Sequence, residues 1–176
     1  MKKCTIILML AIATQVSAQN AANVTDTSVN TMQNGWYIEG AGQSILGVTF
    51  NYERYFSKKP GGLSVHVGFG GGYLPSIFED GVTVFGAISA GLSYNIPVSA
   101  NKQHFIEVGV GYAYLFGGTG SDAGGGSLGS VNAGYRYISP SGKLQIRATL
   151  MPAVFLLSGG GGGPLPWAGF SIGRRF

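Results

Sequence analysis

From Gly35 onward the sequence alternates apolar residues with small or polar residues, and this period of two is the pattern of a β-strand. In residues 104–116, apolar side chains occupy every second position from Ile106 to Phe116, and mainly small residues occupy the positions between them. After residue 35 no helical period of useful length competes, and no apolar run approaches the roughly 18 residues of a membrane-spanning helix. Eight strands are therefore predicted, at residues 35–43, 47–56, 63–73, 82–96, 104–116, 127–139, 144–156 and 167–176.

The connections between these runs are of two kinds, which nearly alternate along the chain. Compact turns with Pro, Gly or Lys follow the second and sixth runs, and a polar connection of intermediate length follows the fourth. Longer or glycine-rich connections follow the third, fifth and seventh runs, and only the short connection after the first run departs from the scheme. Short turns at one end and longer loops at the other are typical of a transmembrane antiparallel up-and-down β-barrel. We therefore predict an all-β barrel of eight strands with both barrel termini on the short-turn, periplasmic side.

Composition indicates which face of the barrel points outward. Only 10% of the residues are charged, against roughly 25% in an average soluble domain, while 12% are aromatic and 31 residues are glycine. In a soluble barrel the outer face would carry many Lys, Asp and Glu residues, whereas here it would be mostly Gly, Ser, Ala and Thr. Eight strands also enclose too little space for so many large apolar side chains. The apolar faces are therefore predicted to contact lipid, and the small and polar faces to line the lumen.

Aromatic residues near the strand ends are predicted to form girdles at the two membrane interfaces. The alternative is that they are ordinary strand aromatics. The predicted girdle residues are Trp36, Tyr52, Tyr112, Tyr114, Tyr135, Tyr137, Trp167 and Phe176.

The same alternation turns seven ionisable residues into the lumen, near the periplasmic ends of their strands. Carboxylates and guanidiniums in so narrow a space are expected to pair, because pairing offsets the cost of desolvating them. We interpret this layer as a salt-bridged plug, with a gated polar conduit as the alternative. Arg175 is expected to pair with a carboxylate, first of all Glu39, whereas Arg174 on the opposite face should reach the lipid head groups. The predicted lumen charge network comprises Glu39, Glu53, His66, Glu107, Arg136, Arg147 and Arg175.

Small residues are predicted to line the lumen above the charged layer. Glycine there either permits the strong curvature of a narrow barrel, which we favour, or leaves a small cavity open to the outside.

Residues 1–18 have the features of a secretory signal peptide: a basic start, a short apolar core and small residues before a cleavage site after Ala18. A buried helix or a retained anchor is the alternative. Residues 19–34 are polar and are predicted to form a flexible lead to the barrel at 35–176. The only cysteine, Cys4, falls in the signal segment, so no disulfide or cysteine metal site is expected in the mature chain.

Sequence motifs for catalysis are absent. There is no phosphate-binding G-x-x-x-x-G-K-[ST] stretch, and His66 and His104 lack the spacing of a metal site. Loss of Lys2 and Lys3 with the signal peptide would lower the net charge from +4 to +2, so the basic composition does not indicate a nucleic-acid partner. We predict no catalytic residue, cofactor or metal, and a protein that is not an enzyme.

These features together resemble the small outer-membrane β-barrel proteins of Gram-negative bacteria, the OmpA/OmpX-type eight-stranded class. The resemblance rests on the signal peptide, the alternating runs, the segment NYERYF at 51–56 and the C-terminal WAGFSIGRRF at 167–176. It implies export through the Sec pathway to the outer membrane, contact with outer-membrane lipid and lipopolysaccharide, and a monomer. It also implies that the barrel-assembly machinery reads an insertion signal, here Phe170, Ile172 and Phe176.

The expected function is a non-enzymatic structural or surface-interaction role. A narrow porin-like channel or small-ligand transporter is the first alternative, and a lipid-modifying barrel enzyme is the less favoured one.

Overall fold

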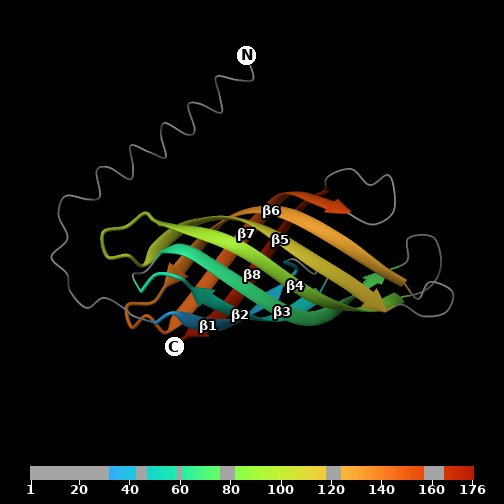
Figure 1. Cartoon of the computed structure of the whole chain (residues 1–176), viewed down its shortest axis with the longest axis horizontal. Coiled ribbons are helices and arrows are strands. Elements are labelled where there is room, and N and C mark those ends of the chain that lie inside the picture. Colours follow the sequence, from blue (N-terminus) through green and yellow to red (C-terminus); the bar gives the residue numbers. More distant parts are fainter. Residues whose placement is uncertain (1–31, 43–46, 59–60, 76–81, 118–123, 157–164) are drawn as a thin grey trace, which may run out of the picture.

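The computed structural model describes residues 32–42, 47–58, 61–75, 82–117, 124–156 and 165–176. Each strand pairs antiparallel with its neighbours in sequence, and β1 also pairs with β8, so the sheet closes into a barrel (Figure 1). Every strand end lies within three residues of its predicted position, and the predicted eight-stranded antiparallel barrel is confirmed. Within these described ranges, no helix is long and apolar enough to cross a membrane. The strands are β1 (Asn34–Gly40), β2 (Gly47–Tyr55), β3 (Gly62–Pro75), β4 (Val82–Pro97), β5 (His104–Gly117), β6 (Gly124–Ile138), β7 (Leu144–Leu156) and β8 (Leu165–Arg175).

The barrel closes where its first and last strands meet. The backbone N–H of Asn34 donates to the carbonyl of Phe176 at 3.2 Å, and the N–H of Phe176 donates back at 2.9 Å. This closure lies at the same end of the barrel as the β2–β3, β4–β5 and β6–β7 connections (Figure 1). We call it the turn end and the opposite end the loop end. The predicted signal peptide and most of the lead lie outside the described residues.

Side chains alternate between the lumen and the outer surface along every strand. In β2 the inward positions are buried and the outward positions are exposed, in strict alternation from Val48 to Tyr55. Large apolar side chains are the exposed ones, with Phe69 at 66% and Leu150 at 64% exposure. Most of the buried side chains are polar or charged, with Glu53 and Arg136 at 0%. This is the reverse of a soluble barrel and follows the predicted orientation.

Two glycines show how close the strands approach one another. A Cβ added to Gly70 would lie 2.0 Å from the carbonyl oxygen of Val48, and one added to Gly173 would lie 2.0 Å from that of Trp36. These neighbours are backbone atoms of adjacent strands and cannot rotate away. At both positions the glycine is therefore explained by tight strand packing rather than by space left for a ligand.

Trp167 is an exception among the predicted girdle residues, because it faces the lumen. Its indole N–H donates to the carbonyl of Ala41, and its ring packs against the buried cluster of Ala113, Leu128 and Met151. The physical reason is the alternation of side chains along β8: Trp167 is on the same side of the strand as the buried Ser171, whereas the exposed Phe170 is on the other side. Its assignment to the girdle was wrong. The seven remaining girdle residues point outward: Trp36, Tyr52, Tyr112, Tyr114, Tyr135, Tyr137 and Phe176.

Candidate functional site in the barrel lumen

The lumen near the turn end contains two arginines that lie directly opposite each other. Arg136 on β6 pairs in register with Arg147 on β7, and both side chains are buried. Like charges in such a cross-strand position repel each other. The carboxylate of Glu107, on the other neighbour of β6, compensates for this by accepting hydrogen bonds from both guanidiniums.

Arg136 reaches across the lumen and joins three strands. Its Nη1 and Nη2 donate to the two carboxylate oxygens of Glu53 on β2, each at 2.8 Å. Its Nε and Nη2 donate to Oε2 of Glu107 on β5, at 3.0 and 2.7 Å. Bidentate contacts of this kind are the strongest that a guanidinium makes with a carboxylate. Because Arg136 and Glu53 are both completely buried, the pair lies inside the barrel wall and out of contact with water.

Arg147 forms the second half of the network. Its Nε donates to Oε2 of Glu107 at 3.1 Å, and its Nη2 forms an ion pair with Oε1 of the same carboxylate. Its guanidinium carbon lies 4.5 Å from the centre of the Tyr37 ring on β1. A cation over an aromatic face is stabilised most where water is excluded. The network thus extends from β5 around to β1.

Polar side chains that we did not single out from the sequence complete the network. Ser64 donates to Oε1 of Glu53 at 2.9 Å and accepts a hydrogen bond from Nδ2 of Asn95 at 3.1 Å. Gln145 accepts a hydrogen bond from Arg136 at 3.3 Å. All three face inward, Ser64 on β3, Asn95 on β4 and Gln145 on β7. The alternating pattern of the sequence therefore predicts that these side chains face inward, but it does not predict which residue each one contacts.

Arg175 does not reach the carboxylate that we expected. Its Nη2 donates to the carbonyl of Met32 at 2.6 Å, and its guanidinium carbon lies 4.7 Å from the centre of the Tyr55 ring. In the β1–β8 pairing, Arg175 lies opposite Gly35, whereas Glu39 lies opposite Ser171, four residues farther along. Glu39 as the first partner of Arg175 was therefore wrong, and the antiparallel register of the closing strands is the reason.

Two further residues of the predicted network are also buried in the lumen. The carboxyl carbon of Glu39 would be 2.0 Å from a Cβ on Gly42, so this side chain turns toward the loop end. His66 lies opposite Glu53 on β3, and its ring centre is 6.2 Å from that of Tyr37. All seven predicted residues thus face the lumen, and ion pairs join four of them: Glu53, Glu107, Arg136 and Arg147.

The centre of this site consists of charges that pair with one another: Glu53 and Glu107 with Arg136 and Arg147. Across the residues that the structure describes, no group of three His, Cys, Asp or Glu side chains could hold a metal ion. The two histidines are on opposite sides of the wall, with His66 in the lumen and His104 on the outer face, hydrogen bonded to the hydroxyl of Tyr135.

Comparison with known proteins gives matches to solved structures alone, since no protein-family model and no curated protein matches the chain. The N-terminal β-barrel domain of Pseudomonas aeruginosa OprF is similar with a TM-score of 0.50 and 14% identity, over 85% of this chain and 100% of that chain. The chain has the fold of a small outer-membrane β-barrel. The Yersinia pestis outer membrane protein Ail in a phospholipid bilayer nanodisc matches with a TM-score of 0.45 and 15% identity, over 82% and 99% of the two chains. The crystal structure of Ail matches with a TM-score of 0.41 and 15% identity, over 82% and 95%.

Proposed function

We propose that the chain is an integral outer-membrane barrel of a Gram-negative bacterium, that it is not an enzyme, and that its lumen is closed by the charge network. Its role would be structural or one of surface interaction. The observation that carries this proposal is Arg136, which spans the lumen at 0% exposure between Glu53 and Glu107.

The outer surface supports the membrane location. Large apolar side chains cover it between two levels of exposed aromatic residues. At the turn end Trp36 and Tyr52 lie side by side on β1 and β2, and near the loop end Tyr112 and Tyr114 lie on β5. Aromatic residues at both boundaries of an apolar band are typical of outer-membrane barrels.

The layers above and below the charged residues support a closed lumen. Tyr55, Phe105 and Ile138 are buried at the turn end, with exposures of 1%, 0% and 3%. The apolar cluster that contains Leu128 and Met151 fills the lumen toward the loop end. A permeating ion would have to separate buried ion pairs, which is strongly unfavourable when one partner is left unpaired.

Planar-bilayer conductance tests the closed lumen. The purified barrel should give no reproducible single-channel steps. Steps in the native protein that are abolished by lumen-blocking substitutions would instead establish the alternative, a narrow porin-like channel or small-ligand transporter.

A lipid-modifying activity is tested by replacing both His66 and His104 with Ala. The lipid composition of cells that express the variant should match that of cells with the native protein. A change that depends on either histidine would contradict the non-enzymatic assignment.

Export and insertion complete the proposal. Residues 1–18 would direct the chain through the Sec pathway. Phe170 and Ile172 on the outer side of β8, with the exposed Phe176 just after it, would then be read by the barrel-assembly machinery. The inserted protein would be a monomer surrounded by phospholipid and lipopolysaccharide.

A further inference from the structure

Charge is segregated on the outer surface of the barrel. All three acidic side chains within the described ranges, Glu39, Glu53 and Glu107, are buried in the lumen. The described cations outside the lumen all lie at the turn end, in its turns or on outward positions of the strands that lead to it. We call these five residues the basic collar: Arg54, Lys58, Lys102, Lys143 and Arg174.

Two members of the basic collar, Arg174 and Lys143, occupy neighbouring backbone positions at the base of β7 and β8. Arg174 lies on the outer face between Leu144 of β7 and Trp36 of β1, to both of which it is paired in register. Lys143 immediately precedes Leu144 and lies opposite Arg175, since its carbonyl accepts a hydrogen bond from the N–H of Arg175 at 2.7 Å, and its side chain is exposed at the end of the β6–β7 turn. A cation beside a tryptophan at the boundary of an apolar surface, with a second cation in the adjoining turn, suits an anionic lipid head group.

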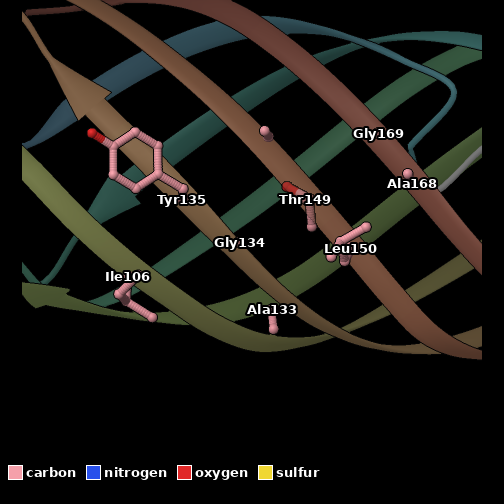
Figure 2. A pocket seen from close by; sticks show the side chains of 9 residues that line it. Ile106, Ala133, Gly134, Tyr135, Thr149, Leu150, Ala168 and Gly169 are labelled. Atoms are coloured by element: carbon pink, nitrogen blue, oxygen red, sulfur yellow. The ribbon is translucent and has the colours of Figure 1, made fainter.

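A groove lies farther toward the loop end and extends across β7 and β8 onto β6 and β5. Its volume is about 470 Å³, and Figure 2 shows Tyr135 and Leu150 standing around a floor of small residues. Ala148 and Ala168 form part of that floor, and a second hollow of about 440 Å³ shares Leu150 and Ala168 with the groove and continues it to Pro166. The groove is thus a shallow stretch of small residues between large apolar side chains such as Ile106 and Leu150.

The spacing between the cations and the groove fits one lipid molecule. Ala148 is four residues from Leu144 along β7. At the usual rise of a strand this is roughly 13 Å. One leaflet contributes about 15 Å to the hydrocarbon core, so an acyl chain whose phosphate is beside Arg174 can reach the groove.

We propose that this face binds an anionic glycerophospholipid from the leaflet at the turn end. Its phosphate lies between Arg174 and Lys143, and one acyl chain runs along the groove past Ala148 and Ala168. The inference rests on the proposed membrane location. An anionic lipid is favoured over a zwitterionic one because its net negative charge complements two cations, whereas an ammonium head group would be repelled by them.

The part of the basic collar on β2 and in the turn after it provides a matched control. Arg54 on β2 also faces outward. Above it, the ring centres of Phe50 on β2 and Phe69 on β3 lie 5.9 Å apart, so large aromatic side chains cover the wall on that side. The control site therefore has the charge without the groove.

Native mass spectrometry of the folded barrel in detergent, with equimolar phosphatidylglycerol and phosphatidylethanolamine, tests the proposal. The native protein should retain phosphatidylglycerol in preference by on the order of tenfold, as expected for two cations near one head group. The Arg174→Gln/Lys143→Gln variant should lose this preference, and the Arg54→Gln/Lys58→Gln variant should keep it. The Ala148→Leu/Ala168→Leu variant, which fills the groove, should retain less of either lipid.

Equal retention of the two lipids by the native protein, or the same loss in both charge variants, would overturn the lipid site. Unchanged retention in the groove variant would overturn the placement of the acyl chain. A chain that fails to fold into phospholipid vesicles would contradict the membrane location itself, so the two failures are distinguishable.

Discussion

Arg136 and Arg147 face each other across β6 and β7, and the single carboxylate of Glu107 accepts hydrogen bonds from both. Replacing Glu107 with Gln should therefore be among the most destabilising changes in the lumen. It leaves two opposed, buried guanidiniums, and the expected loss is about 3–5 kcal/mol in the free energy of unfolding. Urea unfolding in micelles or vesicles, followed by tryptophan fluorescence, measures it. If Glu107→Gln unfolds at the native urea concentration, the network does not stabilise the fold.

The double variant Glu107→Gln/Arg147→Gln is the control for this prediction. Removing one of the two facing cations should restore part of the lost stability, because the remaining Arg136 still has the carboxylate of Glu53. Stability that falls further, as the sum of two independent losses, would contradict the role of repulsion.

The paired arginines at the end of β8 should respond differently to substitution. Arg175 is buried, donates to Met32 and lies over the Tyr55 ring, whereas Arg174 is exposed on the outer face. Arg175→Ala should cost about 2 kcal/mol in unfolding free energy, from the lost charged hydrogen bond and cation–π contact. Arg174→Ala should change it less. Equal effects in the same urea titration would mean that β8 does not alternate as described.

Strand packing at Gly70 is tested by its replacement with Ala. The new Cβ would lie 2.0 Å from a backbone oxygen, and relief requires movement of β2 or β3. We expect a loss of about 1–3 kcal/mol, typical of overpacking. Gly40→Ala is the matched control, because nothing lies within 4 Å of the added Cβ there. Similar stabilities for the two variants, measured by urea unfolding, would contradict the close approach of the strands.

The two tryptophans should report opposite sides of the barrel wall. Trp36 faces outward at 36% exposure, whereas Trp167 faces the lumen and is hydrogen bonded to Ala41. Brominated lipids should therefore quench the emission of the Trp167→Phe variant, in which Trp36 remains, and leave that of Trp36→Phe largely unquenched. Strong quenching of the Trp36→Phe variant, with little quenching of the Trp167→Phe variant, would show that Trp167 faces lipid and belongs to the girdle.

Most of the fold could be predicted because an alternating pattern encodes both strand position and side-chain direction. The inward orientation of Glu53, Glu107 and Arg136 follows directly from their place in such runs. Trp167 was assigned to the girdle because it is an aromatic residue near a strand end. Its place in the alternating run, on the same side as Ser171, already predicted that its side chain faces the lumen.

The specific pairings could not be predicted in the same way. Which residue faces Arg175 depends on the stagger between β1 and β8, which close the barrel from opposite ends of the chain. No short turn connects those two strands, so no local sequence feature sets their register. The cross-lumen contact of Arg136 with Glu53 likewise requires the diameter and shear of the closed barrel. Such contacts are properties of the assembled sheet rather than of any single run.

The central claim is a closed barrel whose apolar face contacts the membrane, and its electrophoretic behaviour tests this most directly. Membrane fractions of expressing cells should contain the protein with the outer membrane, and SDS gels should show it migrating differently before and after boiling, because a closed barrel resists SDS until heated. A protein found in the soluble periplasm, with a mobility unchanged by boiling, would contradict the account.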